Sequence, residues 1–143
     1  MTIVAHPLDA VAALGAAALF GGMLLFATVV TPTVFRSLTG TPVQAFLRSV
    51  FPLYYLYVLV TSLAGGLATI SSNPRLGSAL LAIAVAAAVL RQVVMPRVNA
   101  ARDAELAGDT QAKSRFQMLH RFSVAVNLTQ LLLAGVVVVR LLP

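Results

Sequence analysis

Four polar residues recur at helical spacing within an apolar segment near the C-terminal end of the chain. They are His120, Ser123, Asn127 and Gln130. At 100° per residue of α-helix, their side chains fall within an arc of roughly 80°. Imidazole, hydroxyl and amide groups can bind a ligand or link helices through hydrogen bonds. Because polar side chains are costly against lipid, we expect this stripe to face other helices or a ligand.

Two arginines, an asparagine and a tyrosine extend this set of candidates. Arg91 lies about one turn inside an apolar segment, where it either reaches the lipid headgroups or pairs with an anionic ligand. If the helix continues through the proline that follows, Asn99 and Arg102 share its face. An interfacial aromatic belt explains Tyr55 more simply than a ligand site does. The candidate ligand-binding residues are therefore His120, Asn127, Ser123, Arg91, Asn99, Arg102 and Tyr55.

The same polar residues allow a purely structural interpretation. Helices in lipid lack a hydrophobic driving force between them and rely on close packing and interhelical hydrogen bonds. For Ser123 and Asn127 we favour such a packing role over ligand binding. For His120, which precedes Arg121 near the expected interface, a hydrogen-bonded or headgroup-directed role is favoured over a ligand role.

Patterns that carry catalysis are sparse in this chain. It has no cysteine, so disulfides, thiolate zinc sites, iron–sulfur clusters and cysteine nucleophiles are excluded. No Ser-His-Asp spacing, glycine-rich phosphate loop or pair of carboxylates is present, and an enzyme is therefore a minority interpretation. All four acidic residues lie outside the apolar interiors, which argues against proton-coupled antiport through an embedded carboxylate.

Haem and copper fit the residues poorly. A b-type haem usually has axial ligands on facing helices, and His6 and His120 belong to opposite sides of the expected membrane. Met118 and His120 point about 200° apart on a helix, so they cannot chelate one copper ion together. A site of His120 alone, or of His120 with Met95 or Met23, stays open. We assign no cofactor and no metal, and keep a haem-binding or oxidoreductase protein using His120 as a third alternative.

The composition indicates that the solvent around this chain is lipid. Of its 143 residues, 59% are hydrophobic and 10% are charged, with a mean hydropathy of +0.94. A soluble domain of this length could not cover so much apolar surface. The net charge of +6 comes from basic residues that flank apolar segments, which is a membrane-topology pattern and argues against nucleic-acid binding.

We predict an all-α fold in one domain, an integral membrane four-helix bundle. The expected spans are residues 10–33, 52–70, 76–96 and 120–140. A threonine cap followed by a proline begins an amphipathic stretch, which predicts a short interfacial helix that ends at Pro52 before the second span. Pro32 bends or ends the first helix. A polar helical hairpin, in which Asp103 and Lys113 face each other, links the third and fourth spans.

The distribution of basic residues predicts how the chain crosses the membrane. The connections on one side carry eight Lys and Arg residues, and the other side carries two, Arg75 and Arg140. By the positive-inside rule both termini lie outside the cytoplasm, which in a bacterial inner membrane is the periplasmic side. Small residues at a spacing of four, such as Ala18 and Gly22, make a homodimer or larger membrane assembly the expected partner besides the bilayer.

Four short motifs resemble those of a known membrane-protein family. F-x-x-L-H-R-x-S-V-x-x-N at residues 116–127 is similar to the fourth-helix signature of the transmembrane protein 205-like family, which carries domain of unknown function 4149. M-P-R-V-N-A-A-R-D at 95–103 resembles its third-helix ending, and T-P-T-V-F-R at 31–36 and F-P-L-Y-Y at 51–55 fit its first two helices. The resemblance covers nearly the whole chain. It implies a four-span integral membrane protein and implies little about activity.

The leading functional interpretation combines these observations. With the expected topology, polar candidates from all four helices gather at the cytoplasmic ends of the spans. We expect a site there that binds or transports a small solute, a metal complex or a lipid headgroup. The alternative is a structural or accessory membrane subunit without a transport role, in which the polar residues only hold the bundle together.

Overall fold

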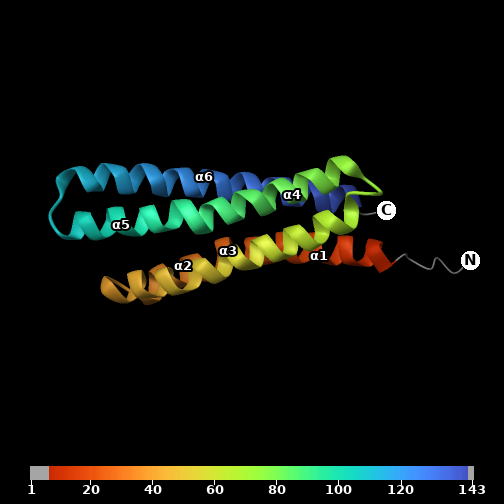
Figure 1. Cartoon of the computed structure of the whole chain (residues 1–143). Coiled ribbons are helices and arrows are strands. Elements are labelled where there is room, and N and C mark those ends of the chain that lie inside the picture. The colour runs from red at the N-terminus through yellow and green to blue at the C-terminus, as the bar shows by residue number, and fades with distance from the viewer. Residues whose placement is uncertain (1–6, 142–143) are drawn as a thin grey trace, which may run out of the picture.

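The computed structural model describes residues 7–141, and these residues form four long helices joined by short turns (Figure 1). The helices comprise 31, 29, 33 and 32 residues, and each is long and apolar enough to cross a membrane. At about 1.5 Å per residue they exceed a hydrocarbon core of about 30 Å, so each helix also reaches beyond it. The prediction of an all-α, four-span membrane bundle is confirmed.

The four long helices form two hairpins. The elements are α1 (Pro7–Leu25), a π turn (Phe26–Val30), α2 (Thr31–Ser37), α3 (Thr41–Thr69), α4 (Pro74–Val89), a second π turn (Leu90–Val94), α5 (Met95–Leu106) and α6 (Thr110–Leu141). We call residues 7–69 the first hairpin and residues 74–141 the second hairpin. Both described ends of the chain lie at the same end of the bundle as the α3–α4 turn (Figure 1). We call the opposite end, which carries the turns at 38–40 and 107–109, the basic end.

The main core lies in the half of the bundle away from the basic end. All four long helices contribute fully buried side chains to it, among them Leu19, Val58, Ile83 and Val137. The helices α1 and α3 approach each other backbone to backbone, because a Cβ added to Gly15 would lie 3.0 Å from the Gly65 Cα. A smaller cluster of Tyr55, Leu90 and Val94 lies nearer the basic end. The hairpins are therefore held together most firmly on the side of the termini.

A proline follows two residues after each π turn. The N–H of Thr31 donates to the Phe26 carbonyl oxygen, and the N–H of Met95 donates to that of Leu90, five residues back in each case. Proline has no N–H and its ring crowds the preceding turn, so a widened turn lets the helix continue through it. The first long helix accordingly continues to Ser37, where the sequence allowed either a bend or an end.

The two π turns also mark an internal repeat. The sequence V-V-x-P-x-V stands at residues 29–34 and again at residues 93–98. Each copy lies on the first long helix of its hairpin, and both hairpins run to the basic end and back (Figure 1). This is the pattern of a parallel repeat. In membrane proteins built from repeats, ligand sites lie where the halves meet.

The predicted interfacial helix is not a separate element. Residues 41–51 are the first turns of α3, which continues through Pro52 to Thr69. Its N-cap is Gly40, with a φ of 65° that favours glycine, rather than the threonine that follows. A proline inside a helix removes one backbone hydrogen bond but does not end the helix when residues on both sides favour it.

Candidate functional site

A cavity of about 340 Å3 lies between the two hairpins, on the basic-end side of the main core. Its size falls within the range of small-molecule sites in proteins, roughly 300–1,000 Å3. Both hairpins and both π turns contribute to its walls. The lining residues are Met23, Phe26, Ala27, Thr31, Phe35, Leu47, Phe51, Tyr54, Tyr55, Leu90, Val94, Met95, Val98, His120, Ser123, Val124, Asn127, Leu128 and Leu131.

Aromatic side chains of the first hairpin form one wall of the cavity. The ring of Phe26 stacks on that of Tyr54 with centroids 4.3 Å apart, and the ring of Phe51 stacks on that of Tyr55 at 5.9 Å. The two tyrosine rings contact each other edge to face at 5.3 Å. Aliphatic side chains line the cavity from the second hairpin. Most of the cavity surface is therefore apolar.

Asn127 of α6 links two tyrosines of α3 across the hairpins. Its Nδ2 donates to the Tyr55 Oη at 3.0 Å and to the Ser123 carbonyl oxygen at 2.8 Å. Its Oδ1 accepts a hydrogen bond from the Tyr54 Oη at 3.2 Å. The same groups thus tie the hairpins together and present polar atoms to the cavity.

Two further members of the polar stripe on α6 line the cavity. The Ser123 Oγ donates to the His120 carbonyl oxygen at 2.9 Å. The imidazole of His120 is exposed and stacks on the ring of Phe116, with centroids 5.8 Å apart. His120 therefore lies at the rim of the cavity. Gln130 does not line the cavity; it is buried, its Nε2 donates to the Ile83 carbonyl oxygen at 3.1 Å, and its Oε1 has no partner within residues 7–141.

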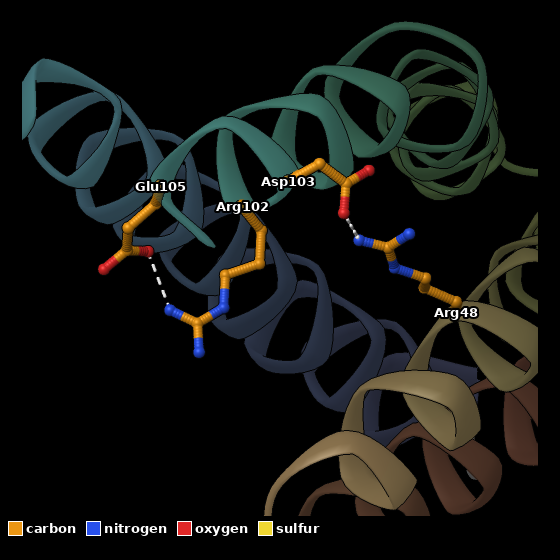
Figure 2. A network of polar contacts seen from close by, with 4 residues as sticks. All are labelled: Arg48, Arg102, Asp103 and Glu105. Atoms are coloured by element: carbon orange, nitrogen blue, oxygen red, sulfur yellow. Dashed lines mark hydrogen bonds and ion pairs between the residues drawn. The ribbon is translucent and has the colours of Figure 1, made fainter. Parts of the chain in front are cut away.

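The structure places the remaining three candidates away from the cavity lining. The Nε of Arg91, in the second π turn, donates to the Pro52 carbonyl oxygen at 3.1 Å. The guanidinium of Arg102 pairs with Glu105 at 2.7 Å (Figure 2) and lies 5.3 Å from the ring centroid of Phe116. Asn99 is half-buried on α5. Of the seven candidates, Tyr55, His120, Ser123 and Asn127 are brought together.

Charged residues meet between the hairpins at the basic end. Asp103 of α5 forms an ion pair with Arg48 of α3 (Figure 2). The expected pairing of Asp103 with Lys113 is therefore replaced by one across the hairpins. The two partners are 55 residues apart, so no local spacing in the sequence could indicate the contact.

We did not expect the π-turn residues Phe26, Leu90 and Val94 to line a site. The available signal was the repeated V-V-x-P-x-V, which places a proline at equivalent positions in two helices. Met23 and Met95 also line the cavity with His120. Within residues 7–141, no group of three or more His, Asp or Glu side chains is arranged to hold a metal ion. His6 lies outside the described residues.

One protein-family model matches residues 14–107, which is more than half of the chain. The match includes Tyr55, Arg91, Asn99 and Arg102 and ends before α6. Searches of curated proteins and of solved structures give no match. The likeness to transmembrane protein 205-like proteins stays a prediction. The chain belongs to the family described as domain of unknown function DUF4149.

Proposed function

We propose that this multi-pass membrane protein binds a neutral, mostly apolar small molecule in the cavity between its hairpins. The observation that carries the proposal is the chemistry of the lining. It contains aromatic and aliphatic side chains with a few hydroxyl and amide groups, the imidazole of His120 at the rim, and no Lys, Arg, Asp or Glu. An anion or a charged metal complex would need a compensating charge in such a site. Of the ligand classes expected from the sequence, a small solute fits best, and the lining favours one that is neutral and amphipathic.

The π turns support a binding role for this position. Single π turns inside α-helices are rare and occur frequently at functional sites. Here Phe26 and Ala27 from one π turn and Leu90 and Val94 from the other line the same cavity. Two interrupted helices at equivalent positions of a repeat are a sequence pattern typical of membrane binding sites.

A structural subunit is the second candidate function. The hydrogen bonds of Asn127 to Tyr54 and Tyr55 favour it, because they join α6 to α3 without any ligand. Interhelical hydrogen bonds of this kind stabilise bundles in lipid. The two functions differ in whether the cavity is occupied, and a binding measurement separates them.

We also infer that the basic end faces the cytoplasm and that the termini face the periplasm of a bacterial inner membrane. Eight of the ten Lys and Arg residues belong to the connections of the basic end or to the span ends beside it. The positive-inside rule assigns such a side to the cytoplasm.

The neutral fluorophore N-phenyl-1-naphthylamine tests the binding proposal on protein in lipid nanodiscs. The chain has no tryptophan and three tyrosines, of which two line the cavity, so in nanodiscs whose scaffold protein lacks tryptophan and tyrosine the tyrosine fluorescence reports on occupancy. We expect saturable quenching of this fluorescence above the linear background of empty nanodiscs. Ala27→Phe fills the cavity and should abolish the saturable part, whereas Ala13→Phe, on an exposed face of α1, should preserve it. Equal quenching in both variants would refute the proposal.

A further inference from the structure

The hydrogen-bond donors of the cavity can be assigned because the Ser123 carbonyl oxygen determines the orientation of the Asn127 amide. The Ser123 carbonyl oxygen can only accept, so the group 2.8 Å from it must be the Asn127 Nδ2. The Oδ1 then faces Tyr54, whose hydroxyl must donate to it. The second N–H of the amide points to the Tyr55 Oη, which accepts. Both donors of Asn127 and the donor of Tyr54 are thereby used.

The other hydroxyl groups of the lining also donate within the protein. The Ser123 Oγ donates to the His120 carbonyl oxygen at 2.9 Å. The Thr31 Oγ1 donates to the Phe26 carbonyl oxygen at 2.9 Å. His120 is exposed at the rim, where its ring N–H can meet water. None of these groups requires a ligand.

The Tyr55 hydroxyl differs from the other hydroxyl and amide groups of the lining because its hydrogen has no acceptor in the described residues. Its Oη accepts from Asn127, and within residues 7–141 no acceptor receives its hydrogen. The side chain is 4% exposed and lines the cavity. A buried donor without an acceptor is costly, and more so in an apolar surrounding. An acceptor that enters the cavity would remove this cost.

We propose that the Tyr55 hydroxyl donates a hydrogen bond to a carbonyl oxygen of the bound molecule. This inference rests on the proposed function and names the chemical class of its ligand. A carboxylate or phosphate would also accept, but the lining has no Lys or Arg to balance it, and His120 lies at the exposed rim. The ligand is therefore neutral, with an apolar body and a carbonyl group. A lipid-soluble quinone ring and an acyl ester both have this chemistry.

Matched probes with and without carbonyl groups test the inference in nanodiscs. Menadione and 2-methylnaphthalene share one ring system, and only the first carries carbonyl oxygens. After correction for partition into empty nanodiscs, we expect menadione to bind the wild-type protein about fivefold more tightly. Tyr55→Phe should remove this preference without weakening 2-methylnaphthalene. Tyr57→Phe is the control, because that hydroxyl donates to the Ala18 carbonyl oxygen outside the cavity.

Infrared spectroscopy adds a readout that a packing role would not change. The carbonyl stretch of bound menadione should lie at lower wavenumber in the wild-type protein than in Tyr55→Phe, since a hydrogen bond weakens the carbonyl bond. In a second arm, methyl decanoate and undecane compete with N-phenyl-1-naphthylamine for the cavity. A Tyr55-dependent preference for menadione alone identifies a ring carbonyl, and one for the ester alone identifies an acyl chain. A preference in both arms identifies carbonyl recognition in general.

The outcomes separate the inference from the proposed function. If all probes bind saturably but Tyr55→Phe changes neither preference, the carbonyl assignment is wrong while the cavity remains a binding site. If no probe binds saturably to the wild-type protein, the binding function fails and the carbonyl assignment fails with it.

Discussion

Arg48 of α3 and Asp103 of α5 form an ion pair that joins the two hairpins at the basic end (Figure 2). The other ion pairs of residues 7–141, Arg102 with Glu105 and Arg115 with Asp109, lie within the second hairpin. Arg48 directly follows Leu47, which lines the cavity. The pair therefore spans the hairpins where buried contacts are few, and it acts on their separation more than on the main core.

Reversing the charge of Asp103 should widen the basic end without unfolding the bundle. Both partners are more than a third exposed, so the pair contributes only about 0.2–1 kcal/mol to stability. Asp103→Arg replaces attraction with repulsion, and we expect a longer and broader distance between spin labels on cysteines at Ser49 and Ala100. The absence of native cysteines makes this double electron–electron resonance measurement direct. Arg48→Asp combined with Asp103→Arg should restore the wild-type distances, and failure to do so contradicts the prediction.

Gly77→Ala should destabilise the α3–α4 packing. A Cβ at this position would lie 2.5 Å from the Ile70 Cα and 2.8 Å from the Ile70 nitrogen, so the backbone must shift. Overpacking of this kind costs roughly 1–3 kcal/mol. We expect a lower Tm in detergent, followed by circular dichroism. Gly21→Ala is the control: its Cβ meets nothing within 4 Å, and the gain in helix propensity leaves stability unchanged or raises it.

Much of the fold follows from local patterns that the sequence displays. Apolar runs of membrane-spanning length predict the four helices, and the hairpin between the last two spans is also found. The helical spacing of Ser123 and Asn127 places them on one face, as the structure has them. These features depend on residues within a few turns of each other.

The parts of the fold and of the candidate site that local patterns do not predict depend on contacts between residues far apart in the chain. The pairing of Asn127 with Tyr54 and Tyr55 spans more than 70 residues, and in the sequence alone a belt of interfacial tyrosines was the simpler explanation of these side chains. The π turns change which face Arg91 presents, because each adds one residue to a helical turn. A helical wheel drawn without this insertion groups Arg91 with Asn99 and Arg102, none of which lines the cavity.

Cysteine labelling should show which end of the bundle faces the cytoplasm. Ser37 and Ser114 are exposed at the basic end, and Ser72 is exposed in the α3–α4 turn. We expect a membrane-impermeant maleimide to label Ser72→Cys from the periplasmic side of intact cells, and Ser37→Cys and Ser114→Cys only in inverted vesicles. Labelling of Ser37→Cys and Ser114→Cys from opposite sides would contradict the four-span topology. The reverse pattern for all three would contradict the orientation alone.

Replacing Asn127 distinguishes a hydrogen-bonded lock from a ligand site. Asn127→Leu leaves the Tyr54 hydroxyl without its acceptor and removes the donor that Tyr55 accepts from, so we expect a loss of about 1–2 kcal/mol in unfolding free energy. Asn99→Leu is the matched control, because Asn99 has no side-chain hydrogen bond in the part of the chain that the structure describes. Unfolding in detergent, followed by circular dichroism, measures the unfolding free energy of each variant against that of the wild-type protein.

The triple variant Tyr54→Phe, Tyr55→Phe and Asn127→Leu carries this prediction further. Replacing all hydrogen-bonding partners by apolar groups of similar shape is nearly neutral, so most of the stability lost in Asn127→Leu should return. Binding of menadione should stay at the level of 2-methylnaphthalene, since the donor of Tyr55 is gone. A triple variant that regained both stability and the carbonyl preference would contradict a role for these groups in the site. One that regained neither would mean that the cluster is needed for the fold itself.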